Sequence, residues 1–224
     1  MFDVDGTLVR SNEMDDICFT QTIKSELGIA EPSSEWAEYE HVTDTGIVSA
    51  LYQHKHRSTI NKDHLHRFRD RFAESIAAAL INDPGCCRAL PGAHKILNEL
   101  YNREGIALAI ATGCWTISAQ LKLDHAGFQL GNIPMVGSDH IMARAAIMQE
   151  AARLAEQAHS VSGFDKIVYV GDGSWDAKAC QSLDWLFLGV GEGEQARLLA
   201  DLGAAVVIPH YEQAAPFWNL IDSI

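Results

Sequence analysis

The sequence is poor in the features that mark several large classes of protein. Its five cysteines are an odd number and form no CxxC pair, which argues against a disulfide framework and a zinc site. No apolar run reaches the roughly 18 residues that a membrane-spanning helix needs, and no charged-then-apolar leader begins the chain. We therefore expect reduced thiols in a cytoplasmic protein that neither spans a membrane nor is secreted.

Positive charge is also scarce. The 224 residues hold 17 Lys and Arg against 30 Asp and Glu, so the formal net charge is -13. Because nucleic-acid binding rests on positive charge, we expect no nucleic-acid partner. An anionic substrate is still compatible, since a bound metal can supply local positive charge. The length suits one α/β domain, with or without an insertion.

The second half of the chain alternates between apolar runs and helical patterns. This alternation predicts a parallel sheet that is covered by helices. The wholly apolar stretch 106–111 is typical of a strand buried on both faces. The first segment, 1–9, predicts a short apolar strand that runs into DVDGT, where glycine and aspartate indicate a turn. We predict an α/β, Rossmann-like core with helices on both faces. Its further strands are expected near 133–137, 166–170, 185–190 and 204–208, and its helices near 93–104, 115–126, 142–158, 175–183 and 194–202.

The region between the first strand and this core has helical character throughout. Within 61–81, apolar residues recur at spacings of three and four, as on one face of a helix. The chain then changes character near Asn82–Pro91, where proline and glycine cluster. We therefore predict an inserted all-helical domain, 12–85, and a catalytic core made of 1–11 and 86–224.

Two aspartates directly follow the first apolar strand. Asp3 and Asp5 are two residues apart, so on a strand both carboxylates point the same way. The carboxyl ends of parallel strands are where such sheets bind ligands. Gly6 permits a sharp turn there. The alternative is an acidic turn that only caps a helix, but the position after a buried strand favours a functional site.

Two later strands also end in polar loops. Thr112 and Gly113 follow the strand at 106–111, and their hydroxyl and backbone N–H groups suit phosphate oxygens. Asp172 and Asp176 follow the strand at 166–170. Carboxylates, water and phosphate oxygens are the ligands that Mg²⁺ prefers, so Asp172 is a candidate magnesium ligand with Asp176 in support.

Together these loops resemble the motifs of the haloacid dehalogenase superfamily, in its phosphoglycolate phosphatase-like and β-phosphoglucomutase-like group with a helical cap. DVDGTL resembles the first motif, IATG the second and GDGSWD the fourth, and LPGAHKILNEL resembles the return from cap to core. The third motif, usually a lysine, has no obvious match. Arg144 is the candidate, because arginine keeps the positive charge and can bind phosphate with two N–H groups.

The resemblance implies a magnesium-dependent phosphohydrolase that acts on a small phosphorylated metabolite. Asp3 would be the nucleophile that forms an aspartyl-phosphate, and Asp5 the general acid and base. Asp3, Asp172 and Asp5, through its backbone carbonyl, would hold Mg²⁺. Thr112, Gly113 and Arg144 would bind the phosphoryl oxygens.

Three alternatives remain beside this hypothesis. A sugar-phosphate mutase would use the same core, and a protein that had lost catalysis would only bind a phosphometabolite. A signalling receiver domain also phosphorylates an aspartate, but it lacks a large helical insertion. The protein is expected to be a monomer or a homodimer. Because only Met1 and Phe2 precede Asp3, we also expect the natural chain to have several more apolar residues upstream.

Overall fold

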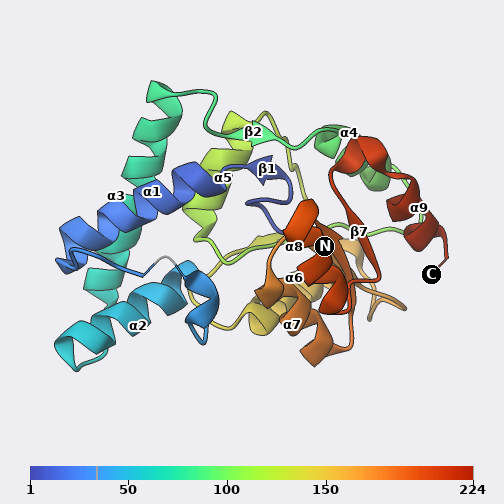
Figure 1. Ribbon diagram of the computed structural model, residues 1–224. Helices are drawn as coiled ribbons and strands as arrows, with labels where there is room; N and C mark the ends of the chain where they lie inside the picture. Colours follow the sequence, from blue (N-terminus) through green and yellow to red (C-terminus); the bar gives the residue numbers. More distant parts are fainter. Residues whose placement is uncertain (34, 224) are drawn as a thin grey trace.

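The computed structural model describes residues 1–33 and 35–223 (Figure 1). Its centre is a parallel sheet. β3 (Ile110–Ala111) pairs with β4 (Met135–Val136), while β5 (Val168–Gly171) pairs with β6 (Leu186–Val190), which pairs with β7 (Val206–Ile208). Phe2 forms parallel bridges to both Ile110 and Val170, so the start of the chain joins the two groups of strands. The predicted α/β class is confirmed.

The first strand is short. Only the stretch around Phe2 takes part in the parallel sheet, where the Phe2 N–H donates to the Ala109 carbonyl and the Asp3 N–H donates to the Val170 carbonyl, both at 2.9 Å. Residues 4–8 turn back on themselves, because the N–H groups of residues 7–9 all donate to the Val4 carbonyl. The turn expected at DVDGT therefore follows the first strand directly.

Both faces of the sheet are buried, as the apolar runs predicted. Successive strand residues point to opposite faces. Val168 and Val170 belong to the apolar cluster on one face, whereas Tyr169 between them belongs to the cluster on the other. The first face is covered by α4 (Ala93–Tyr101), α5 (Thr116–His125) and α9 (Ala215–Asp222), and the second by α6 (Arg144–His159), α7 (Ser174–Leu183) and α8 (Gly193–Asp201). A short turn, η3 (Tyr211–Gln213), precedes α9.

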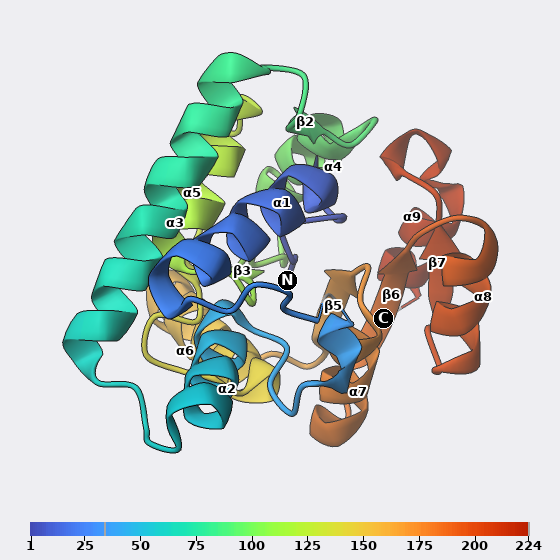
Figure 2. The same ribbon diagram turned by 60° about the vertical axis from the view of Figure 1, so that its left-hand side comes forward.

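The described part of 12–82 holds helices only. These are α1 (Asn12–Thr22), its π-helical continuation η1 (Ile23–Leu27), the 3₁₀ turn η2 (Trp36–Glu38), α2 (Asp44–His56) and α3 (Lys62–Asn82). The apolar stripe predicted on 61–81 is real, since Phe68, Phe72 and Ile76 of α3 are fully buried. In Figure 2, α1 crosses α3, and α5 of the core lies against α3. No helix in the described ranges is long and apolar enough to cross a membrane.

A small antiparallel ribbon stands where the chain enters and leaves this helical segment. β1 (Val9–Arg10) pairs with β2 (Arg88–Ala89), just before α1 and just after α3. The ribbon fixes both ends of the helical segment beside the carboxyl end of the first strand. It therefore places the segment next to the loops that carry the predicted site residues.

Candidate active site

The loops that follow Phe2, β3 and β5 meet at one edge of the sheet. There they line a cleft of about 220 Å³ together with residues of α1, η2 and the loop before α2. Asp3, Thr112 and Asp172 all face this cleft. A larger cavity of about 580 Å³ lies at the other end of the strands, beside Met1 and Ile167, and contains none of these side chains. The carboxyl-end cleft, which holds the buried carboxylates of Asp3 and Asp172, is the better candidate site.

One cluster of buried carboxylates centres on Asp3. Carboxylate oxygens of Asp3, Asp172 and Asp176 all lie within 4.8 Å of one another. Arg144 Nη1 is 3.5 Å from Asp3 Oδ1 and 3.4 Å from Asp176 Oδ1. Arg144 is thus the cation of this cluster, and it comes from the first turn of α6, as the sequence suggested.

Burial and mutual repulsion dominate the electrostatics of the Asp3 cluster. Burial raises the pKa of Asp172 well above its usual value, and the charges of Asp3 and Asp176 raise it further. Burial also raises the pKa of Asp176, to about 7, although Arg144 opposes this shift. The pKa of Asp3 is raised as well, mainly by burial. Three carboxyls beside one guanidinium leave the cluster short of positive charge.

Two glycines allow these groups to come so close. A Cβ on Gly6, whose φ is +68°, would lie 1.9 Å from Asp172 Oδ2. A Cβ on Gly113 would lie 2.4 Å from Arg144 Nη2. Both glycines belong to the sequence motifs, and the structure gives each a steric reason, since any side chain there would displace a charged group from the site.

The Asp3 cluster suits a divalent cation such as Mg²⁺. Its oxygen-only donor set matches the preference of that ion. Asp176 Oδ1 is buried without a hydrogen-bond partner among the described residues, and Asp172 accepts only one long hydrogen bond, from Asn12 Nδ2 at 3.3 Å. Among the described residues Arg144 is the one cation beside these three carboxylates, so a further positive charge is needed to balance them. Asp3 and Asp172 are therefore the side chains best placed to hold the ion.

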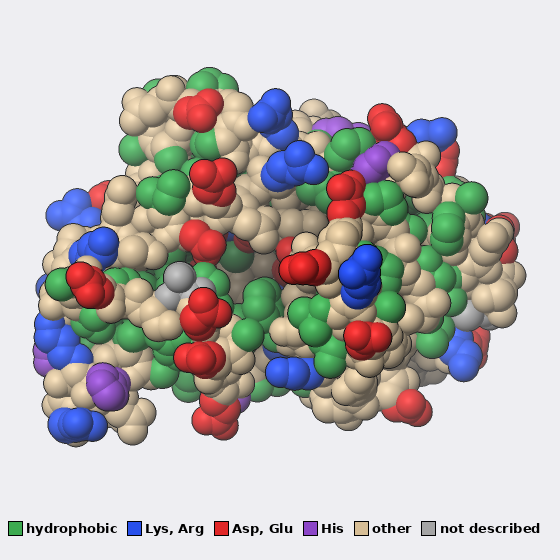
Figure 3. Space-filling view, viewed as in Figure 1, with side chains coloured by type: hydrophobic (Ala, Val, Ile, Leu, Met, Phe, Trp, Pro, Cys, Tyr) green, Lys and Arg blue, Asp and Glu red, His purple; other side chains and the backbone are tan. Residues whose placement is uncertain are grey.

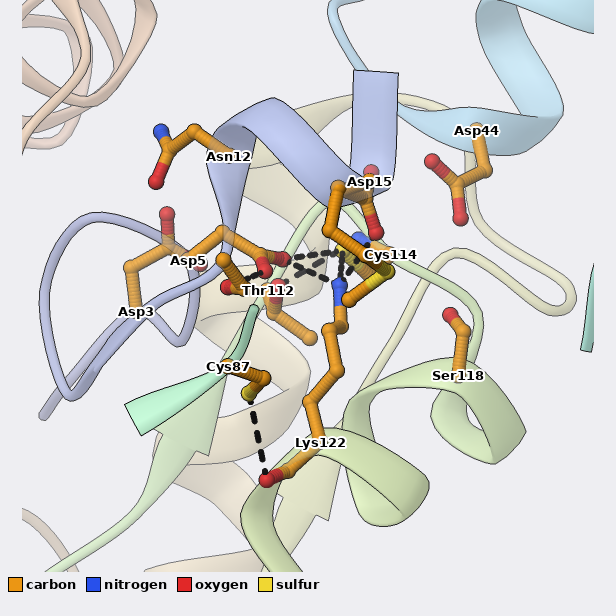
Figure 4. Close-up of polar contacts among 12 residues, drawn as sticks. Asp3, Asp5, Asn12, Asp15, Asp44, Cys87, Thr112, Cys114, Ser118 and Lys122 are labelled. Carbon is orange, nitrogen blue, oxygen red and sulfur yellow. Dashed lines mark hydrogen bonds and ion pairs between the residues drawn. The ribbon is translucent and has the colours of Figure 1, made fainter. Parts of the chain in front are cut away.

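A second cluster surrounds Asp5 (Figure 4). Lys122 Nζ lies 2.6 Å from Asp5 Oδ2, 2.6 Å from Asp15 Oδ1 and 3.4 Å from Cys114 Sγ. Asp5 also accepts hydrogen bonds from Ser11 Oγ and from Cys114 Sγ, the latter at 2.8 Å. Asp5, Asp15 and Cys114 could by themselves hold a metal, but the lysine ammonium already stands among them and supplies the charge.

The charge of Lys122 controls this second cluster. Burial raises the pKa of Asp5, but the charge of Lys122 together with the hydrogen bonds from Lys122, Cys114 and Ser11 outweighs burial, and the pKa ends below its usual value. Burial lowers the pKa of Lys122, yet Asp15 and Asp5 reverse the effect and hold it well above its usual value. Asp15 is left with a pKa raised to about 6, chiefly by burial. Asp5 and Lys122 therefore form an ion pair at neutral pH.

Sequence reasoning missed Lys122. It lies on the same buried face of α5 as Ala119 and Leu123, and its side chain is completely buried. A lysine at an apolar position of a helix that follows the second motif was the available signal, because lysine is almost never fully buried unless it is paired. Asp15 was missed for a different reason. An acidic residue in the first turn of a helix is common in any protein, because it interacts favourably with the helix dipole.

The loop before α2 docks onto the site. The Asp44 N–H donates to the Gly113 carbonyl at 2.8 Å, and its carboxylate accepts from the Trp115 N–H at 2.8 Å. Thr43 Oγ1 donates to the Met142 carbonyl at 2.8 Å, and Arg144 Nη2 donates to the Val42 carbonyl at 3.0 Å. The helical segment is thus hydrogen-bonded to the loops that surround Asp3.

The structure brings most of the predicted residues together. Asp3, Thr112, Gly113, Arg144, Asp172 and Asp176 lie within one cluster or directly beside it. The side chain of Asp5 turns instead toward Lys122, although Asp5 also lines the cleft (Figure 4). The arrangement supplies a buried carboxylate, an acid–base candidate and one guanidinium. Such groups can supply a nucleophile, a proton donor or acceptor and a cation for an anionic ligand.

The family assignment agrees with this geometry. Residues 1–190 match the family described as haloacid dehalogenase-like hydrolase, and the chain belongs to that family. No curated protein matches at a significant level.

Solved structures share the fold over the whole chain. A hydrolase from Pseudomonas syringae has 20% identity and a TM-score of 0.72, with 100% of this chain and 97% of that chain covered. CbbY from Rhodobacter sphaeroides in complex with phosphate has 19% identity and a TM-score of 0.68, with 96% and 94% covered. A putative β-phosphoglucomutase from Bacteroides vulgatus has 15% identity and a TM-score of 0.67, with 99% and 87% covered.

Proposed function

We propose that this hydrolase cleaves small phosphate monoesters through an aspartyl-phosphate on Asp3, with Mg²⁺ as cofactor. The observation that carries the proposal is the contact of Asp3 with Arg144 in a cleft where Asp172 and Asp176 supply two more carboxylates. The similar structure of CbbY was determined with phosphate and with xylulose-(1,5)bisphosphate, which agrees with a phosphorylated substrate.

In the first step, Asp3 is the nucleophile. One carboxylate oxygen attacks phosphorus, the bond from phosphorus to the ester oxygen breaks, and an acyl-phosphate forms on Asp3. The departing alcohol oxygen takes its proton from Asp5, which has received that proton from the monoanionic phosphate ester. The guanidinium of Arg144 and the Thr112 hydroxyl hold the phosphoryl oxygens beside the backbone of Gly113, where no side chain intervenes. A bound Mg²⁺ supplies the positive charge that reduces repulsion between the anionic nucleophile and the anionic phosphoryl group.

In the second step, Asp5 acts as a base. It takes a proton from a water molecule that attacks phosphorus, and the bond from phosphorus to Asp3 breaks, which releases inorganic phosphate and restores both carboxyl groups. Lys122 would keep Asp5 ionised and hold its carboxylate in a fixed direction, since the ammonium contacts Asp5 Oδ2 at 2.6 Å. In this proposal Lys122 is a positioning residue, because it acts through Asp5.

Residues 12–85 would serve as the cap over this site. Their loop at 42–45 is hydrogen-bonded to the core loops, and α1 contributes Asp15 to the Lys122 cluster. A cap in this position excludes water from the first step and contacts the leaving group.

The test is hydrolysis of p-nitrophenyl phosphate with Mg²⁺ or with EDTA, by the parent chain, by Asp3→Asn and by the matched control Asp165→Asn. Asp165 is an exposed loop residue. We expect Mg²⁺-dependent turnover by the parent and the control and none by Asp3→Asn. A phosphoryl adduct on the peptide that contains Asp3, trapped by acid quench, would support the covalent step. Turnover by Asp3→Asn at the parent rate would show that Asp3 is not the nucleophile.

The same assay separates hydrolase from mutase and from binding protein. A hydrolase releases inorganic phosphate from every ester that it consumes, whereas a sugar-phosphate mutase returns the phosphoryl group to the sugar. A protein that only binds would show neither product while its melting temperature rose with the phosphate ester.

A further inference from the structure

The two ends of the candidate cleft differ in charge. At the phosphoryl end stand Arg144 and the carboxylates that suit a divalent cation. The remainder is lined by acidic groups of the helical segment, namely Asp15, Asp16 and Asp44. Apart from Arg144, no lysine or arginine lines the cleft in the part of the chain that the structure describes. Lys122 stands behind Asp5 and Asp15, fully buried and engaged by both. The far end therefore offers an anion no free cationic partner.

The surrounding surface strengthens this asymmetry. Figure 3 shows a hollow near the centre of the molecule, and Asp and Glu side chains gather beside it on the side of the helical segment. A second anionic group on a substrate would approach against this charge. Salt screens exposed charges from one another only beyond about 8–10 Å at physiological ionic strength, so like charges nearer than this weaken the binding of such a group.

Aromatic side chains form the rest of the far end. Trp36 donates Nε1 to Asp16 Oδ1 at 2.8 Å and packs edge-on against Phe19, and Trp175 lines the cleft as well. Aromatic faces attract ammonium groups and pack against apolar ones, but they give a carboxylate or phosphate no compensation for lost water. A carboxylate held by an indole N–H beside such faces is a recognition site for a cation.

The cleft also limits size. Its volume of about 220 Å³ must hold the phosphoryl group and the leaving group. This is below the roughly 300–1,000 Å³ that is typical of pockets for drug-sized ligands. An alcohol portion of a few heavy atoms therefore fits inside the cleft, whereas a larger one must extend out of it.

We propose that the substrate is a small phosphate monoester whose alcohol portion carries no second anionic group and is bound best when it carries an ammonium. Bisphosphates and phosphorylated carboxylic acids are disfavoured, because Asp16 stands at this end without a cationic partner and no free cation lines it among the described residues. This inference rests on the proposed phosphatase activity and adds the class of its substrate.

The test compares three esters of similar size, which are 2-aminoethyl phosphate, ethyl phosphate and carboxymethyl phosphate, with p-nitrophenyl phosphate as a reference. We expect kcat/KM for the aminoethyl ester to equal or exceed that for the ethyl ester. The carboxymethyl ester should be at least tenfold poorer than either. Turnover of carboxymethyl phosphate at or above the rate of ethyl phosphate would overturn this inference alone. No turnover of any ester, the reference included, would overturn the proposed function and this inference with it.

A pair of variants on α1 assigns the selectivity to the cleft. Asp16→Asn removes the charge but keeps an oxygen that can accept from Trp36, whereas Glu13→Gln removes an exposed charge from the same helix outside the cleft. We expect Asp16→Asn to reduce the aminoethyl-to-carboxymethyl ratio at least threefold, mainly through KM, and Glu13→Gln to leave it unchanged. Because variant and parent are compared on the same ester, differences in leaving-group reactivity between the esters cancel. An unchanged ratio in Asp16→Asn would overturn the proposed role of this end of the cleft.

Discussion

Lys122 Nζ lies 2.6 Å from Asp5 Oδ2, and the lysine side chain is completely buried. The two residues are 117 positions apart in the chain. Because Asp15 accepts from the same ammonium, one lysine of the core ties the motif loop to the first helix of the helical segment. The proposed acid–base residue is therefore held by a partner that lies outside the sequence motifs.

Replacing Lys122 by methionine should impair both stability and chemistry. Asp5 and Asp15 would remain buried without their cation, and removing one partner of a buried ion pair costs about 3–5 kcal/mol. Adding Asp15→Leu to Lys122→Met should recover part of this loss, as thermal unfolding would show. Full additivity of the two substitutions would contradict a shared cluster.

Two esters with different leaving groups distinguish the effect of Lys122→Met on catalysis from its effect on folding. With Asp5 poorly positioned, Lys122→Met should lose much more kcat on ethyl phosphate, whose alkoxide needs a proton, than on p-nitrophenyl phosphate, whose phenolate leaves without one. Equal losses on both esters would mean that the substitution affects folding and not Asp5.

Arg144 should be essential for transition-state binding. Its guanidinium contacts Asp3 and Asp176 and is the single arginine or lysine that lines the cleft among the described residues. We expect Arg144→Ala to lower kcat/KM a hundredfold or more, on the order of 3 kcal/mol, and Arg144→Lys to retain part of the activity because it keeps the charge. Arg153→Ala is the matched control, since Arg153 lies on the same helix and is exposed. A loss below threefold in Arg144→Ala would remove this residue from the site.

Gly113 tests the close approach of backbone and guanidinium. In Gly113→Ala the new methyl would lie 2.4 Å from Arg144 Nη2, so the arginine must move. Because it meets the end of a long side chain, we expect at least a tenfold loss of kcat/KM with little change in melting temperature. Gly85→Ala, in an exposed turn, should leave activity unchanged. Parent-like activity in Gly113→Ala would show that the position of Arg144 is not critical.

Magnesium and pH should act together on stability. The pKa values of Asp15 and Asp176 are raised to about 6 and about 7, chiefly by burial, and that of Asp172 is raised well above its usual value. A group with a raised folded pKa binds more protons folded than unfolded, so the metal-free protein should lose stability as pH rises from about 4 to 7. Asp5 does not reverse this trend. Because its pKa is lowered in the folded protein, its contribution to the free energy of unfolding is lost only when the pH falls below about 4.

The corresponding measurement is the melting temperature with EDTA and with Mg²⁺ at pH 5.5 and 7.5. Since Mg²⁺ binds ionised carboxylates, its stabilising shift should be larger at pH 7.5. Asp172→Asn should lose most of the shift. A shift of the same size at both pH values, or one that persists in Asp172→Asn, would contradict a magnesium site at this cluster.

The sequence by itself determined the class of fold and the Asp3 half of the site. Apolar runs that end in polar loops follow from local rules, since a parallel strand buried on both faces must be apolar and its carboxyl end must open to solvent. For this reason the sequence alone predicts that Asp3, Thr112 and Asp172 belong to one site. Arg144 could be proposed because it begins a helix in the expected order along the chain.

Only the tertiary structure decided the rest. The contacts of Lys122 with Asp5 and Asp15 span 117 and 107 positions, and no periodicity in a sequence reports a pairing at such a distance. The burial of Val4, Leu8 and Val9 was also decided by the tertiary structure, because these residues lie in a turn rather than in the sheet and are fully buried there. The hydrophobic pattern of a sequence indicates which residues are buried. Which residue a buried side chain contacts depends instead on which distant segments meet when the chain folds.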